Sequence, residues 1–538
     1  MTHIEAEVVI IGAGVAGAIT ACKLACQGVK NILVLEAGPR IDRADTVLKF
    51  RRSPYIDSLS GFPNPAWAPR PDWSEADGAD AQKPYIENIG PVIAREEYLR
   101  IVGGTTWHWD GITPRFLPVD FRLQSVYGVG ADWPIDYDTL EPFYSEAEYE
   151  LGVAGDDAKF DGSPRSKRFP MSPIPGTYGD KVIAGRMKDA GFPFASRPAA
   201  RASVPYQGRA QCMGFGTCSP ICPSGAQYGA IYHVERAEKL GVKVMENTRV
   251  DRIVANGSVT SIEARKPDGT PVSVRAKIFV LSANGIETPR LLLMSAGEKH
   301  REGIANSSGA VGKNFMEHPF LACRMTLGDV VVTGRGPQVV SASTIFRDGS
   351  FRSERPGFVL TTVNRSGVHE IANDLLARGA EASVIDDEIR KHTMRDVNFI
   401  ISIEQLPDPA NRITVNWDRR DAAGQPALRQ FYSFSGYEKK GFAHAREAFG
   451  KIAIALSAEI SPIGDPAPQN HLIGTTRMGD DPKTSVTDSF GRSHDHKNLF
   501  IVSSSLFPTA GTINPTLTIA ALALRTAEEI ARQLKNGG

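Results

Sequence analysis

The first forty residues alternate between short apolar runs and one segment of helical periodicity. Residues 8–11 form an apolar run that stops at a glycine, and residues 31–35 form a second run. Both runs predict buried parallel strands. Between them, small and apolar residues recur at spacings of four, three and four and would share one helix face: Val15, Ile19, Cys22 and Cys26. The order strand, helix, strand predicts a βαβ unit and an α/β fold.

The turn before this helix contains three glycines in the spacing GxGxxG. In a dinucleotide-binding unit, Gly12 makes the tight turn, Gly14 lets a pyrophosphate approach the backbone, and Gly17 lets the helix pack close to the sheet. The helix N-terminus attracts the negative charge. Glu36 ends the second strand, where its carboxylate can accept hydrogen bonds from ribose hydroxyl groups. These features predict a dinucleotide site but do not separate NAD from FAD.

Further glycine- and asparagine-containing motifs lie along the rest of the chain. Gly103 and Gly104 precede a cluster of Trp and His side chains, and a Gly-Gly turn allows backbone to lie against a flat ring. The other motifs are residues 283–292, 311–319, 470–471 and 507–518. In this order, the motifs resemble those of the glucose–methanol–choline (GMC) oxidoreductases, which use FAD to oxidise alcohols. The resemblance extends over nearly the whole chain.

The resemblance implies a Rossmann-like FAD-binding domain interleaved with an α+β substrate domain that is built on an antiparallel sheet. The FAD-binding domain would comprise residues 1–45, 205–320 and 465–538. The substrate domain and a lid would comprise residues 46–204 and 321–464.

The resemblance also implies a catalytic pair near the flavin, which by motif is His471 and Asn514. His471 would take the hydroxyl proton of the alcohol while hydride leaves for flavin N5, a role that suits the near-neutral pKa of histidine. Asn514 would hold the substrate oxygen, and His318 would support the cofactor fold. The implied cofactor contacts are Gly12, Gly14, Gly17, Glu36, Gly103, Gly104, Thr105, His108, Asn284, Asn514, Pro515 and Thr516.

His108 has two interpretations. Some family members bond a His of this motif to the flavin 8α-methyl group, whereas in others the flavin is free; we expect the free form. Candidate substrate contacts are polar residues near this motif or after a predicted strand: Asp110, Arg115, Glu404 and Gln405. Polar residues at strand ends are also often merely solvated. Asp110 stands where the related sugar dehydrogenases have a small residue, so their sugar preference does not transfer.

Three of the six cysteines lie in one Gly- and Pro-rich loop, residues 211–225. Five residues separate Cys212 from Cys218 and three separate Cys218 from Cys222, which is followed by proline. A Cys-Pro ending is common where thiolates bind iron–sulfur centres. Three local thiols suit a 3Fe-4S cluster, which the related dehydrogenases carry at matching positions. The alternatives are a zinc site completed by His233 and free structural thiols.

Composition limits the possible partners. The 538 residues include 61 Lys and Arg and 61 Asp and Glu, with no polybasic segment, so we expect no nucleic-acid partner.

No run of about 18 apolar residues predicts a membrane span, and the N-terminus does not resemble a signal peptide. Within the family, the chain resembles catalytic subunits of bacterial FAD-dependent glucose, fructose and gluconate dehydrogenases. These work with a small subunit that bears a twin-arginine export signal and with a multihaem cytochrome c. The resemblance therefore implies a periplasmic enzyme that is exported without its own signal peptide and is membrane-associated through its partners.

We therefore expect an FAD- and 3Fe-4S-dependent dehydrogenase of a sugar or polyol that passes electrons to a cytochrome c. One alternative is a glycoside 3-dehydrogenase, which shares these parts but oxidises a different ring carbon. Another is an oxygen-using pyranose oxidase, which some motifs also resemble but which needs no metal relay. A non-catalytic electron-transfer flavoprotein is the alternative from another class, and the pair His471 and Asn514 argues against it.

Overall fold

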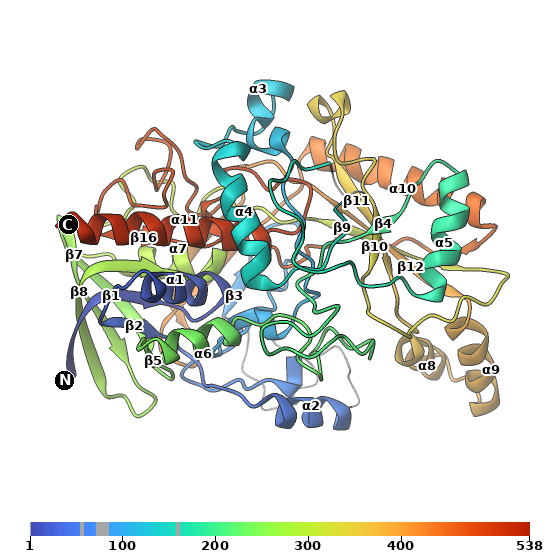
Figure 1. Cartoon of the computed structure of the whole chain (residues 1–538), viewed down its shortest axis with the longest axis horizontal. Coiled ribbons are helices and arrows are strands. Elements are labelled where there is room, and N and C mark those ends of the chain that lie inside the picture. Colours follow the sequence, from blue (N-terminus) through green and yellow to red (C-terminus); the bar gives the residue numbers. More distant parts are fainter. Residues whose placement is uncertain (1, 54–58, 72–84, 158–161, 538) are drawn as a thin grey trace.

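A computed structural model describes residues 2–53, 59–71, 85–157 and 162–537 (Figure 1). Its first layer is a seven-stranded sheet in the order β5-β2-β1-β8-β7-β6, with β16 also paired to β8. The parallel strands are β1 (Thr2–Ile11), β2 (Ile32–Leu35), β5 (Lys243–Met245), β8 (Pro271–Leu281) and β16 (Leu499–Ile501). The antiparallel extension is β7 (Ser258–Arg265) and β6 (Arg249–Asn256).

The predicted βαβ unit is confirmed, because β1 and β2 pair in parallel and α1 (Val15–Cys26) connects them. All four residues of β2 are buried, as the apolar run indicated. The predicted apolar face of α1 is one turn too long, since Cys22 is buried but Cys26 is exposed at the end of the helix. Close packing against the sheet therefore stops before the last turn.

The second layer is a six-stranded antiparallel sheet, which forms the right half of the molecule in Figure 1. Its order is β15 (Glu459–Ile460), β9 (Phe320–Thr326), β12 (Asp396–Ile403), β11 (Phe358–Val363), β10 (Ser341–Ser343) and β4 (Ala195–Ser196). Helices α10 (Gly436–Leu456) and α5 (Tyr178–Asp189) pack near it and share its apolar core. This sheet confirms the implied antiparallel substrate layer.

A third, small sheet joins segments that are far apart in the sequence. It pairs β13 (Arg412–Arg420) with β14 (Pro426–Phe431) in antiparallel and adds β3 (Ile86–Asn88) in parallel to β14. Local patterns could not predict this sheet, because its parallel pairing joins residues more than 300 positions apart.

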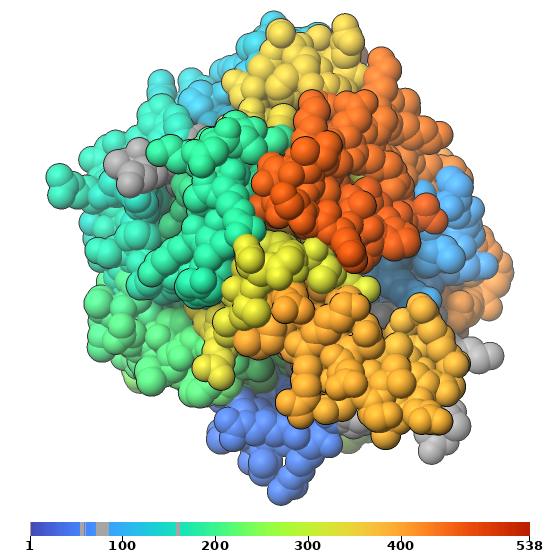
Figure 2. Space-filling view, turned by 90° about the vertical axis from the view of Figure 1, so that its right-hand side faces the viewer, coloured from blue at the N-terminus to red at the C-terminus, as the bar shows by residue number. Residues whose placement is uncertain are grey.

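The remaining helices surround these sheets. They are α2 (Arg43–Arg52), α3 (Leu123–Tyr127), α4 (Tyr137–Leu151), α6 (Ile231–Lys239), α7 (Asn284–Met294), α8 (Val368–Ala377), α9 (Ala382–Thr393) and α11 (Thr516–Lys535). Short 3₁₀ turns are η1 (Leu59–Gly61), η3 (Gly104–Trp107), η4 (Pro118–Phe121), η5 (Ser350–Ser353) and η6 (Ser504–Leu506). Figure 2 shows the substrate-layer side, where the orange segment that includes α8 and α9 lies above the blue segment of α2 at the lower edge. No helix in the described parts of the chain has the length and apolar character needed to cross a membrane.

The packing of α4 bears on the proposed division into domains. All strands of the first sheet lie within the three segments predicted for the FAD-binding domain. However, α4 lies in a segment predicted for the substrate domain, and it packs against α11 within the core of the first sheet. Residues 54–58 and 72–84, within the stretch 46–204 predicted for the substrate domain and lid, lie outside the described residues. The domain boundaries stay a prediction.

Candidate active site

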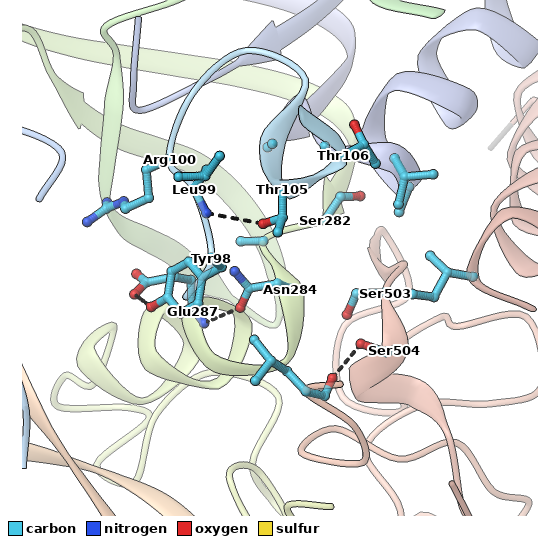
Figure 3. Close-up of a pocket in the computed structure, with 18 of the residues that line it drawn as sticks. Tyr98, Leu99, Arg100, Thr105, Thr106, Ser282, Asn284, Glu287, Ser503 and Ser504 are labelled. Atoms are coloured by element: carbon cyan, nitrogen blue, oxygen red, sulfur yellow. Dashed lines mark hydrogen bonds between the residues drawn. The ribbon is translucent and has the colours of Figure 1, made fainter. Parts of the chain in front are cut away.

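A cavity of about 490 Å³ lies at the carboxyl ends of β1, β2 and β8. Open α/β sheets bind their ligands at this edge. Segments far apart in the sequence complete its wall, and Figure 3 shows several of them meeting around one space. Most of the predicted cofactor and catalytic residues line it: Gly12, Gly14, Glu36, Gly104, Thr105, His108, Asn284, His471, Asn514, Pro515 and Thr516.

The glycine turn has the geometry that a pyrophosphate requires. A Cβ at Gly17 would lie 2.0 Å from the carbonyl oxygen of Gly12, so only glycine lets α1 pack this close to the turn. A Cβ at Gly14 would meet nothing within 4 Å, and this glycine lines the cavity. The N-terminus of α1 has no side-chain cap and no acidic residue in its first turn. Its free backbone N–H groups can therefore bind an anion.

Glu36 is fixed beside this turn. Its Oε2 accepts a hydrogen bond from the N–H of Ala13 at 2.9 Å, and its Oε1 accepts one from the N–H of Gly38 at 3.0 Å. Burial raises the pKa of this carboxyl, while the two N–H groups and Arg100 lower it. A carboxylate has about four acceptor positions, so two stay available to ribose hydroxyl groups. The placement fits the predicted ribose contact.

A second helix N-terminus reaches the same cavity. Asn514, Pro515 and Thr516 line the wall where α11 begins, and this helix also lacks a side-chain cap and an acidic first turn. A Cβ at Gly104 would lie 3.0 Å from the Cα of Gly14, so the two glycine turns touch and leave only backbone at this wall. Two N-terminal dipoles and a glycine-lined wall fit a long anionic dinucleotide such as FAD.

His108 lines the cavity next to the cysteine loop. Its Nδ1 lies 3.2 Å from the carbonyl oxygen of Pro220, so Nδ1 carries the hydrogen and donates it. Burial lowers the pKa of His108 to about 4, which keeps the ring neutral. The ring also packs edge-on against Phe62. That the flavin is not covalently bonded to His108 stays a prediction.

The proton positions at the predicted catalytic pair, His471 and Asn514, follow from one chain of hydrogen bonds. His318 Nε2 lies 3.1 Å from the carbonyl oxygen of Gly511, which only accepts, so Nε2 carries the hydrogen. Neutral His318 then has a bare Nδ1, which accepts from His471 Nδ1 at 2.9 Å. Neutral His471 is left with a bare Nε2, which faces the amide nitrogen of Asn514 at 3.3 Å. The lone pair of a base therefore lies at the cavity wall.

Electrostatics keep both histidines neutral. Burial lowers the pKa of His318 to about 4. Burial, together with His318 and Arg197, holds the pKa of His471 well below its usual value. The arrangement can therefore accept a proton from a bound hydroxyl group without first losing one to water.

Two residues at this pair have no role assigned from the sequence. Arg197 donates from one guanidinium nitrogen to Asn514 Oδ1 at 2.7 Å, which fixes the amide so that its nitrogen faces His471. Glu317 accepts the backbone N–H of His471 at 2.7 Å and anchors the loop. Glu317 lies in a motif that the sequence does display, whereas nothing in the sequence separates Arg197 from the other arginines.

A buried hydroxyl–carboxylate group at another part of the wall was also not predicted. Asn284 caps the first turn of α7, since its Oδ1 accepts from the N–H of Glu287 at 3.0 Å. The Glu287 carboxylate accepts a hydrogen bond from the hydroxyl group of Tyr98 (Figure 3) and another from that of Tyr85. Burial raises the pKa of Glu287, but Arg290 and other cationic and hydroxyl partners bring it to about 2. This group therefore stays ionised beside the cavity.

Arg115 and Glu404, expected near substrate, do not line the cavity. Arg115 is fully buried and donates to both oxygens of Glu148 at 2.8 Å. Glu404 accepts two hydrogen bonds from Arg352, at 3.0 and 2.6 Å. Both side chains are occupied by internal ion pairs, because a buried charge needs a partner of opposite sign.

Gln405 also lies outside the cavity lining. Its Oε1 accepts from the N–H of Glu317 and from the hydroxyl of Tyr432, both at 2.9 Å. It therefore supports the residue that anchors His471. Of the four residues expected to contact substrate, Asp110 lines the cavity.

The cysteine loop borders the cavity through Ser219. Cys218 is buried, and burial raises the pKa of its thiol, while Cys212 and Cys222 are partly exposed. Within the described ranges, no three His, Cys, Asp or Glu side chains come together as a metal-binding group. His233, the partner for a zinc site, contacts the Tyr228 hydroxyl at 2.8 Å and the carboxylate of Glu150 at 3.1 Å.

A βαβ dinucleotide unit, two open helix N-termini and a His–Asn pair at one cavity define a dinucleotide-dependent oxidoreductase. Sequence comparison identifies the class more closely. The two patterns of the GMC oxidoreductases match residues 187–320 and 407–523. The large subunit of fructose dehydrogenase from Gluconobacter japonicus is 39% identical, over 99% of both chains. The chain belongs to the GMC oxidoreductase family, whose enzymes act on CH–OH donors with FAD.

Other relatives span the same length. The 2-methyl-1,2-propanediol dehydrogenase of Mycolicibacterium austroafricanum is 29% identical over 99% of this chain and 96% of its own. The gluconate 2-dehydrogenase flavoprotein of Pantoea cypripedii is 24% identical over 99% of this chain and 95% of its own. Among solved structures, pyridoxine 4-oxidase from Mesorbium loti has a TM-score of 0.64 at 17% identity, covering 97% of this chain and 99% of that one. Formate oxidase from Aspergillus oryzae has a TM-score of 0.66 at 15% sequence identity, and the match covers 99% of both chains. These structures share the fold.

Proposed function

We propose that this protein is an FAD-dependent dehydrogenase that oxidises a hydroxyl group of a sugar or related polyol. The observation that carries the proposal is the bare Nε2 of His471 at the cavity wall, beside the oriented amide of Asn514. The full-length similarity to the large subunit of a fructose dehydrogenase supports this substrate class.

The side chains divide the work of alcohol oxidation among them. Bound FAD supplies the acceptor for the hydride that leaves the alcohol carbon. His471 Nε2 takes the hydroxyl proton, while its Nδ1–H stays donated to His318. Asn514 Nδ2 donates one amide hydrogen to His471 Nε2 at 3.3 Å. A substrate hydroxyl that donates to Nε2 would replace this bond, and the amide hydrogens of Asn514 could then be donated to the substrate oxygen. Because Arg197 holds the Asn514 carbonyl oxygen, the amide keeps this orientation.

A dye-reduction screen over sugars, glycosides and polyols tests the proposal, with NMR identifying the oxidised carbon. We expect at least one sugar or polyol to reduce the bound flavin and an added electron-accepting dye. A 3-keto product from a glycoside would instead identify a glycoside 3-dehydrogenase. Rapid peroxide formation in air without a dye would identify an oxidase. If no compound reduces the flavin, the result would favour the remaining alternative, a non-catalytic electron-transfer flavoprotein.

For electron transfer, we propose that Cys212, Cys218 and Cys222 bind a 3Fe-4S cluster. The position of the loop supports this proposal, because it runs from the cavity wall at Ser219 to the exposed side chains of Met213 and Phe215. The three thiols are not gathered into a ligand set within the described residues, so metal analysis decides the matter.

Substitution of Cys218 by serine is expected to lower the iron content strongly, because a hydroxyl is a poor substitute for a thiolate ligand of iron. The native protein should contain about three iron atoms per chain. Sugar-dependent reduction of a small dye should persist in the variant, while reduction of a cytochrome c should fail. Cys26→Ser, at an exposed thiol outside the loop, is the matched control. Zinc or no metal in the native protein would contradict the cluster.

We also propose that the enzyme works in a complex in the periplasm, attached to the membrane through its partners. The partners would be a small subunit with a twin-arginine export signal and a multihaem cytochrome c. The designation of one relative as a large subunit supports a multi-subunit assembly. Co-purification of the chain from its native membranes, followed by haem staining, tests this arrangement.

A further inference from the structure

Asp110 presents a carboxylate to the cavity without a partner for it. The residue lines the cavity wall and its side chain is exposed there. Its backbone is anchored, since the Asp110 carbonyl accepts from a guanidinium nitrogen of Arg201 at 2.8 Å. The preceding indole nitrogen, of Trp109, donates to the carbonyl of Tyr228 at 2.8 Å. Among the described residues, the carboxylate itself makes no hydrogen bond or close ion pair.

Asp110 is exposed to the cavity, and two cationic side chains act on its carboxylate. Burial raises the pKa of Asp110, and the charges of Arg201 and Arg197 oppose that rise. Both guanidinium groups are near enough to act on the charge but do not form an ion pair within 4 Å. A carboxylate at a cavity wall with open acceptor positions can accept hydrogen bonds from a bound molecule. Hydroxyl groups can donate such hydrogen bonds, and a carboxylate can accept from two neighbouring ones.

Arg197 ties this carboxylate to the catalytic pair. It donates to Asn514 Oδ1, acts on the charge of Asp110 and lowers the pKa of His471. The other charged group acting on Arg197 is Arg347. Asp110, Asn514 and His471 also line one cavity. A molecule whose reacting hydroxyl lies at the His–Asn pair can therefore present another hydroxyl group to Asp110.

We propose that Asp110 is a specificity-determining residue that accepts hydrogen bonds from substrate hydroxyl groups next to the one oxidised. The substrate class is then a neutral polyhydroxy compound with adjacent hydroxyl groups. Simple alcohols lack the donors, and sugar acids bring a second negative charge toward the carboxylate. This inference rests on the proposed function of the site, since it assumes that an alcohol is oxidised at His471.

The test compares Asp110→Asn and Asp110→Ala with the native enzyme in rapid-mixing flavin reduction. The probes are the best neutral sugar of the screen, its deoxy analogue lacking the hydroxyl next to the oxidised carbon, and the matching sugar acid. We expect both variants to lose about 10- to 100-fold in kcat/KM with the sugar, the range for a hydrogen bond to a charged group. The deoxy analogue should react at nearly the same rate with all three proteins. The sugar acid should react faster with Asp110→Asn than with the native enzyme.

Controls separate this role from damage to the fold. Asp386→Asn, at an exposed aspartate on α9, should leave all rates unchanged. FAD content and melting temperature report folding, and Asp110→Asn keeps the shape of the side chain. Equal loss with the sugar and its deoxy analogue, or no loss with either, would overturn the assignment to Asp110. If the native enzyme oxidises a sugar or polyol and reacts as fast with the deoxy analogue, the proposed function survives and the inference about Asp110 fails. If no alcohol reduces the native flavin, both fail.

Discussion

Replacing His471 with alanine is expected to slow reduction of the bound flavin by about 10²–10⁴-fold, the usual loss when a general base is removed. The variant should still bind FAD, because the glycine turn and Glu36 lie on other elements. Stopped-flow absorbance of the flavin after mixing with substrate measures the rate. The loss should appear in the rate at saturating substrate, since proton removal belongs to the chemical step.

The matched control is His369→Ala, at an exposed histidine on α8, which should leave the rate unchanged. The native rate should be constant across the neutral range, because the pKa of His471 is well below its usual value. It should fall only as the pH drops through that lowered pKa, where protonated His471 can no longer accept. The variant should lack this acid limb. Full activity in an FAD-replete His471→Ala protein would remove His471 from the mechanism.

Replacing Gly17 with alanine is expected to remove FAD binding and to lower the free energy of unfolding by about 3 kcal/mol or more. The added Cβ would lie 2.0 Å from the carbonyl oxygen of Gly12 and 3.3 Å from a methyl group of Ile10. Both are parts of the first strand and its turn, so α1 must move away from the sheet. FAD absorbance after gel filtration measures the first effect, and denaturant unfolding measures the second.

Gly185→Ala provides the control, because Gly185 also lies in a helix and a Cβ there would meet nothing within 4 Å. In a helix interior, alanine is favoured over glycine by about 1 kcal/mol, so this variant should be as stable as the native protein or more so. If Gly17→Ala behaved like the control and kept its FAD, close packing at the turn would not be what requires glycine.

The dinucleotide unit could be predicted because its signals are local. The strands β1 and β2, the glycine turn and Glu36 all lie within the first 36 residues, and each is specified by short-range sterics or periodicity. Reliance on short-range signals also explains the wrong prediction for Cys26. Periodicity placed Cys26 on the packed face, but only tertiary contacts decide where a helix leaves the sheet, and Cys26 is exposed.

The surroundings of the four candidate substrate contacts could not be predicted from the sequence, because burial and hydrogen-bond partners are properties of the folded chain. Arg115 and Glu404 have the chemistry of sugar-binding residues, yet each is held by a buried residue of opposite charge. Asp110 looked no different in the sequence, but the fold leaves its carboxylate facing the cavity. A charged side chain is available to a ligand only where hydrogen bonds and ion pairs within the protein do not already occupy it.

Local signals in the sequence predicted a dinucleotide-binding unit, and the motifs pointed to His471 and Asn514 as the catalytic pair. The tertiary structure alone decided how that pair is prepared for chemistry. His318 sets the tautomer of His471 from 153 residues away, and Arg197 orients Asn514 from 317 residues away. Hydrogen-bond direction depends on which donor and acceptor meet in space, and residues so distant in sequence meet only in the folded chain.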